Sequence, residues 1–243
     1  MSIRPKNSIS KNLNASKVAI TNTKGDAEIQ AAVAGFGYHP VKMDEGLALY
    51  SSAEASVSAQ VAAAGAQRTA SAEMLKTWKI ANTAYQDLAK VSRAIFIKKP
   101  AFLTTLGVSG TQPRSTDGFI TAASTLFDNA LSTSEIQTAL EVKGYTIAKL
   151  QSEKAKITAY DTANDAQESA KGAAQQATKE QDDALSALNA WMAEYKKIAK
   201  VALSKKKQLL EKLGITARTT KTKAQRQAPK KAAATRAAKK IIK

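Results

Sequence analysis

The 243-residue sequence contains no cysteine and a single histidine, and these shortages exclude several kinds of site. Without cysteine the chain forms no disulfide and no thiolate metal centre. The single histidine, His39, cannot supply the two Glu-x-x-His motifs of a di-iron helical bundle. The sequence also lacks the glycine-rich phosphate loop, the His-Glu-x-x-His helix and the nucleophile elbow. We therefore predict no catalytic residue, no cofactor-binding residue and no metal ligand, and expect that the protein is not an enzyme.

Aromatic residues are also scarce, at 5 % of the chain, whereas apolar residues make up an ordinary 44 %. Abundant alanine favours thin, close contacts between helices rather than a thick core. No run of eighteen apolar residues is present, and residues 1–24 lack the apolar stretch of a secretory signal. The expected location is the cytoplasm.

The longest uniform stretch, residues 47–97, contains no proline and repeats apolar side chains at helical spacing. It predicts one long helix, which at 1.5 Å per residue would extend for roughly 75 Å. A helix of that length needs a partner to cover its apolar stripe. The residues predicted to form this stripe are Leu75, Trp78, Tyr85, Leu88, Val91 and Ile95.

The chain supplies a partner, because it matches itself without a gap when it is shifted by 107 positions. The shift superposes Tyr38 on Tyr145 and Gly107 on Gly214. Apolar positions stay apolar and most surface positions differ, as expected for two copies of one structural unit. We predict an all-α fold of two pseudo-symmetric repeats, each a short helix plus a long helix. The long helices would pack as an elongated antiparallel hairpin or coiled-coil bundle, with the short helices at its ends.

These patterns divide the chain into five segments. Residues 1–24 are expected to be a basic, flexible N-terminal arm, extended or disordered. Residues 25–109 and 132–215 are the two repeats, and 110–131 a connecting loop and helix. Residues 216–243 are a basic tail. Gly65 and its counterpart Gly172 could each mark a bend in a long helix or a point of closest contact between the helices, and the small residues around them favour close contact.

The net charge of +17 is concentrated at the two ends of the sequence. Residues 1–24 carry five basic residues and no acid, and residues 216–243 carry ten basic residues and no acid. The intervening residues have a net charge of only +2. A partner with many negative charges would therefore be bound through the ends of the chain.

The C-terminal segment interleaves lysine and arginine with alanine, glutamine and threonine. In composition it resembles the lysine- and alanine-rich tails of linker histones and of bacterial histone-like proteins. Such a segment lacks the apolar side chains to form a core and gains free energy by releasing counterions from a polyphosphate. The residues predicted to contact nucleic acid are Arg218, Lys221, Lys223, Arg226, Lys230, Lys231, Arg236, Lys239, Lys240 and Lys243, assisted by Arg4, Lys6 and Lys11.

Two other interpretations of the tail remain open. It could only raise solubility, or it could lie on a membrane surface, although Ile241 and Ile242 are its only strong apolar anchors. The duplicated body, with the leucine-rich turn Gln-Leu-Leu-Glu-Lys-Leu-Gly-Ile at 208–215, resembles uncharacterised bacterial all-helical proteins with a duplicated long-helix unit. That resemblance implies a fold and no mechanism.

The sequence thus predicts a non-enzymatic helical scaffold that binds nucleic acid or another polyanion through its basic tails, without base specificity. The alternative is a structural or interaction protein whose long helices self-associate into a homo-oligomer, with the tails used for docking or solubility.

Overall fold

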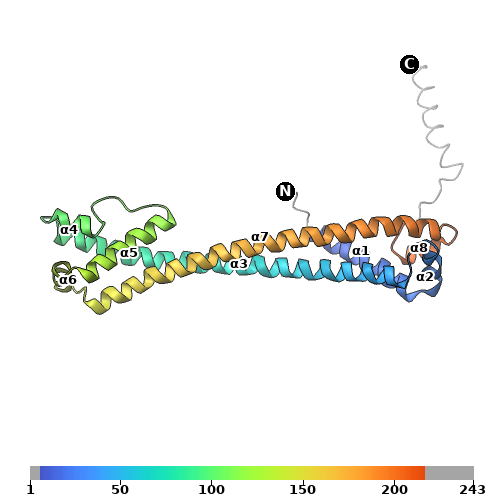
Figure 1. The fold of residues 1–243 in the computed structure, drawn as a ribbon, viewed down its shortest axis with the longest axis horizontal. Coiled ribbons are helices and arrows are strands. Elements are labelled where there is room, and N and C mark those ends of the chain that lie inside the picture. Colours follow the sequence, from blue (N-terminus) through green and yellow to red (C-terminus); the bar gives the residue numbers. More distant parts are fainter. Residues whose placement is uncertain (1–5, 217–243) are drawn as a thin grey trace, which may run out of the picture. The chain divides into compact units, whose positions relative to one another are not determined.

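A computed structural model describes residues 6–216, which form α-helices joined by turns and loops and contain no strand (Figure 1). The all-α prediction is confirmed over this range. The helices are α1 (Lys6–Gly25), α2 (Ala27–Ala34), α3 (Pro40–Ile95), α4 (Pro100–Thr105), α5 (Thr116–Ser132), α6 (Ser134–Glu141), α7 (Ile147–Ala202) and α8 (Lys207–Lys212). Among these described helices, none combines the length and apolar character needed to cross a bilayer.

The helices belong to two compact units. Unit 1 contains residues up to 55 and from 182 onward, and so holds α1, α2, α8, the beginning of α3 and the end of α7. Unit 2 contains residues 56–181, with α4, α5, α6, the end of α3 and the beginning of α7. Both long helices are continuous, at 56 residues each.

Corresponding helices begin at a constant spacing along the chain. Helices α2 and α6 have 8 residues each, α3 and α7 have 56, and α4 and α8 have 6. The members of each pair start 107 residues apart, and α1 and α5 end 107 residues apart. Each short helix is followed by a glycine with positive φ, a conformation that L residues with a Cβ rarely adopt. These glycines are Gly37 (88°), Gly144 (81°), Gly107 (66°) and Gly214 (66°).

The core of unit 2 is built around an aromatic group. The Phe119 ring of α5 lies edge-on to Tyr85 of α3 at 5.5 Å and to Tyr160 of α7 at 5.8 Å. Aliphatic side chains from α3, α6 and α7 surround these rings, among them the fully buried Leu88 and Leu150. Such ring contacts add to the free energy gained by burying apolar area.

Unit 1 includes a helix that the sequence did not predict. Residues 1–24 were expected to be extended or disordered, but residues 6–25 form α1, so the prediction is wrong for the described part of this segment. The buried face of α1 carries Ser16, Ala19, Ile20 and Thr23 at helical spacing. Its weak apolar pattern is misleading because the two hydroxyls bond backbone carbonyls one turn earlier, at 2.9 Å for Ser16 and 2.7 Å for Thr23.

Two further expectations need correction. A Cβ placed on Gly65 or Gly172 would meet no described heavy atom within 4 Å, so neither glycine marks a close contact. Of the predicted stripe, Tyr85 and Leu88 are buried, but Leu75 is 51 % exposed and Trp78 is 37 % exposed. The close helix contact occurs instead at Gly46 of unit 1, where an added Cβ would lie 2.4 Å from Cη2 of Trp191.

Candidate nucleic-acid interface

The ten predicted contact residues of the tail lie outside the described residues. They are Arg218, Lys221, Lys223, Arg226, Lys230, Lys231, Arg236, Lys239, Lys240 and Lys243. Arg4 also lies outside them. The structure describes only the part of unit 1 that precedes the tail and ends at residue 216.

That part of unit 1 joins the basic helix α1 to α8, the last described helix before the tail. The side-chain amide of Asn22, in α1, donates a hydrogen bond to the carbonyl oxygen of Lys212, in α8, at 2.6 Å. Leu213 and Ile215, which follow α8, are buried. Helix α1 and residues 207–215 therefore belong to one folded region.

The N-terminal lysines lie on α1, where the structure describes those from Lys11 onward. Lys11 and Lys17 are exposed, and the Lys17 ammonium lies 5.7 Å from the centre of the Tyr50 ring, a cation–π distance. Lys24 forms an ion pair with Asp44 of α3. Lys11 is exposed, and its contact with nucleic acid stays a prediction.

The structure adds a group of lysines that the sequence analysis did not select. Residues 195–212 contain seven lysines and one acid, Glu211. Four of them are exposed: Lys197 and Lys200 near the end of α7, Lys205 in the turn that follows, and Lys207 at the beginning of α8. The net charge of +2 over residues 25–215 does not reveal this local excess of lysine, because acidic residues elsewhere in that range offset it.

Two other lysines of residues 195–212 form ion pairs with acidic residues at the beginning of α2. Lys206 pairs with Glu28, and Lys212 pairs with Asp26 at 3.1 Å. The hydrogen bond from Lys212 holds the pKa of the Asp26 carboxyl below its ordinary value, and the backbone N–H groups of Ile29 and Glu28 lower the pKa further. Asp26 also caps α2 by accepting those two N–H groups. We call Lys197, Lys200, Lys205 and Lys207 the α7–α8 lysine cluster.

The candidates for chemistry are dispersed. His39 is exposed and lies directly before α3, where its backbone carbonyl accepts the N–H of Met43 at 3.1 Å. Over residues 6–216, no three His, Asp or Glu side chains gather closely enough to hold a metal ion. The hydrogen bond of Tyr50 to Glu54, together with some burial, raises the pKa of Tyr50 to about 12. Its hydroxyl therefore stays protonated near neutral pH and is not available as a general base.

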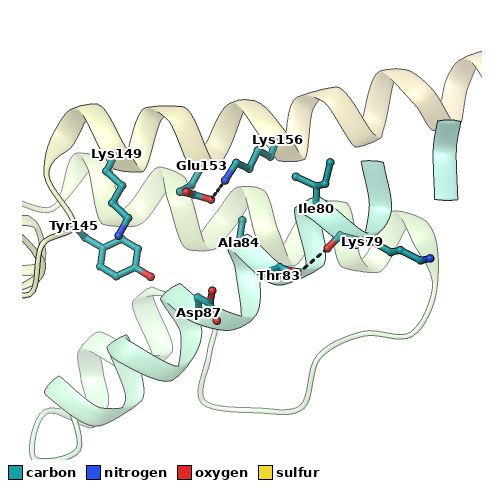
Figure 2. A pocket seen from close by; sticks show the side chains of 9 residues that line it. All are labelled: Lys79, Ile80, Thr83, Ala84, Asp87, Tyr145, Lys149, Glu153 and Lys156. Carbon is teal, nitrogen blue, oxygen red and sulfur yellow. Dashed lines mark hydrogen bonds and ion pairs between the residues drawn. The ribbon is translucent and has the colours of Figure 1, made fainter. Parts of the chain in front are cut away.

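Unit 2 contains an open pocket of about 450 Å³ between α3 and α7 (Figure 2). Its lining includes Ala84 of α3 and Tyr145, both of which are over 90 % buried. Glu153 and Lys156 form an ion pair at 2.6 Å on its α7 side, and Asp87 lies opposite, near the Tyr145 hydroxyl. Burial raises the pKa of Tyr145, and the charges of Asp87 and Glu153 raise it further.

Comparisons with protein-family models, curated proteins and solved structures found no significant match.

Proposed function

We propose that this protein is a non-enzymatic helical scaffold that binds nucleic acid without base specificity, through its basic C-terminal segment and the lysines beside it. The observation that carries the proposal is the α7–α8 lysine cluster. It lies in the folded unit from which residues 217–243, with ten further cations, continue. The Asn22–Lys212 hydrogen bond joins this region to the basic helix α1.

The scaffold consists, in this proposal, of two copies of one helical unit arranged as an antiparallel hairpin. Support comes from the constant 107-residue spacing of four helix pairs and from the matched positive-φ glycines. The duplicated unit includes α1 in one copy and α5 in the other, so it is larger than the segments 25–109 and 132–215.

Binding of this kind depends on the release of counterions from the phosphate backbone. The logarithm of the binding constant should fall linearly with the logarithm of salt concentration, with a slope of about 0.9 for each phosphate neutralised on duplex DNA. Affinity should depend little on sequence, since lysine contacts to phosphate carry no base information.

The deciding experiment compares the full chain with a variant that ends at Thr216 and so keeps α1 and α8 intact. Binding to a short mixed-sequence DNA duplex is followed by fluorescence anisotropy across a salt series. We expect the truncation to lose most of the affinity and several units of the salt slope. A variant with the order of residues 217–243 permuted is the matched control, and it should bind as the native chain does. Equal binding by the truncated and full chains would disprove the proposal.

A second candidate function, self-association through the long helices, is favoured by the exposed apolar side chains of Leu75 and Trp78 on α3. Apolar residues of this size, three positions apart, lie on one face of a helix and suit a contact with another copy. Sedimentation velocity on the chain ending at Thr216 tests it. Concentration-dependent association that Leu75→Gln with Trp78→Gln abolishes would support this function, and a strictly monomeric chain would contradict it.

A further inference from the structure

The strongly basic parts of the chain contain no aromatic residue. Residues 1–35 and 196–243 hold more than half of the 37 lysines and arginines. Neither segment contains phenylalanine, tyrosine or tryptophan. The cations that would meet a nucleic acid are therefore not accompanied, within their own segments, by a ring on which a base could stack.

Folding buries four of the five aromatic rings that the sequence places in unit 1. Tyr38, Tyr50, Trp191 and Tyr195 are each at most 8 % exposed. The Lys17 ammonium also lies 5.7 Å from the centre of the Tyr50 ring, so a cation of the protein itself already occupies a place beside that ring. No tyrosine or tryptophan of unit 1 is thus available to an incoming base.

The fifth ring, Phe36, is 49 % exposed. It lies with the exposed His39 in the turn between α2 and α3. Residues 35–39 contain no lysine or arginine, and the next cation along the chain, Lys42, forms an ion pair with Glu45 at 2.6 Å. A site for single-stranded nucleic acid combines stacking rings with a groove of cations that follows the backbone. This turn has the ring without the cations.

The α7–α8 lysine cluster, by contrast, is carried by packed helices. Lys197 and Lys200 are exposed on α7, whereas Tyr195 and Ala199 of the same helix are fully buried. The buried Leu210 anchors α8 in the same way. The backbone that carries these cations is therefore ordered before binding, which reduces the entropic cost of association. A DNA duplex is also stiff over many base pairs, whereas a single strand would have to be ordered on the surface.

We propose that unit 1 and the C-terminal segment bind double-stranded nucleic acid in preference to single strands. The inference rests on the proposed function and specifies the form of nucleic acid that it uses. Each phosphate neutralised on a duplex releases about 0.9 counterions, against about 0.7 on a single strand. Base stacking on exposed rings is the interaction that would favour a single strand, and the cations of this surface lack such rings.

The experiment titrates the full chain into two labelled probes and follows fluorescence anisotropy across a salt series. One probe is a mixed-sequence DNA duplex, and the other is a single strand with the same number of phosphates and no self-complementarity. We expect the duplex to bind at least tenfold more tightly near physiological salt, with the steeper salt dependence. Equal binding, or tighter binding of the single strand, would overturn this inference and leave the proposed function standing. Binding of neither probe would disprove the proposed function itself, and this inference with it.

A second measurement supplies the missing ring. Ser204 is exposed in the turn after α7, beside the lysine cluster, and Ser204→Trp leaves every charge in place. This variant should bind the single strand several-fold more tightly than the native chain does, with little change for the duplex. Ser204→Leu is the matched control, which adds apolar surface without a ring and should change neither affinity. If Ser204→Trp and Ser204→Leu bound the single strand equally, or if Phe36→Ala abolished single-strand binding, the inference would be wrong.

Discussion

The backbone of Gly46 in α3 lies directly against the indole ring of Trp191 in α7, and the two residues are separated by 145 positions in the sequence. The contact is possible because glycine has no Cβ. It allows Trp191 to pack between Tyr38 and Tyr195, and these rings form the aromatic centre of unit 1. The contact therefore sets the separation of two helix segments within that unit.

Gly46→Ala should destabilise the protein by about 1–2 kcal/mol. Alanine favours a helix over glycine by about 1 kcal/mol, but forcing a methyl group into a packed core costs about 1–3 kcal/mol. Urea denaturation followed by far-UV circular dichroism measures the balance. The indole is stiff and buried, so it cannot move aside easily.

Gly172→Ala is the matched control, because Gly172 lies inside α7 and a Cβ there would meet no described heavy atom within 4 Å. It should stabilise the protein by about 1 kcal/mol through helix propensity alone. If Gly46→Ala were equally stabilising, the close contact with Trp191 would not exist.

Trp191→Ala should cost about 3–5 kcal/mol, since it removes a large buried aromatic side chain. The cavity that remains should itself accept indole, because its walls were shaped around that ring. Added indole should raise the melting temperature of the variant more than that of the native chain. Trp191→Phe is the control, and it should lose less stability and show a smaller indole effect. Equal indole effects on Trp191→Ala and the native chain would contradict this account.

The long helices were predictable, and α1 was not, for a physical reason. Residues 47–97 and their second copy carry apolar side chains at helical spacing without proline, so local pattern alone predicts α3 and α7. In α1 two of the buried positions are Ser16 and Thr23. The Thr23 hydroxyl bonds that of Tyr195, a partner 172 residues away that no local pattern reveals.

The candidate interface was predictable only in part. The charge of the tail and the lysine excess of residues 195–212 are both present in the sequence, but only the structure shows which of these lysines are exposed and which pair with Glu28 and Asp26. The close contact in unit 1 could not be predicted, because only the structure shows that Trp191 is buried against Gly46.

Asp26 should make folding sensitive to mild acid. The Lys212 hydrogen bond and the α2 N–H groups lower its pKa in the folded state, so they stabilise the ionised form. That stabilisation is complete above the pKa of the unfolded chain, near 4, and is lost as pH falls through the lowered, folded-state pKa. Asp26→Asn keeps a capping side chain and removes the charge. The variant should be less stable than the native chain at neutral pH and converge with it in acid, as urea midpoints at several pH values would show. A stability difference that stays constant with pH would contradict this.

Neutralising the α7–α8 lysine cluster should weaken nucleic-acid binding while leaving the tail in place. The four lysines, changed together to glutamine, are exposed, so the fold should be unaffected. Each lysine that contacts a phosphate should reduce the salt slope by about one unit, and the loss of affinity should be similar for all DNA sequences. The matched control neutralises exposed lysines of unit 2, Lys90→Gln with Lys171→Gln. If both variants reduce the slope equally per charge removed, binding follows net charge alone. If only the cluster variant reduces it, the surface beside the tail contacts the phosphates, as proposed.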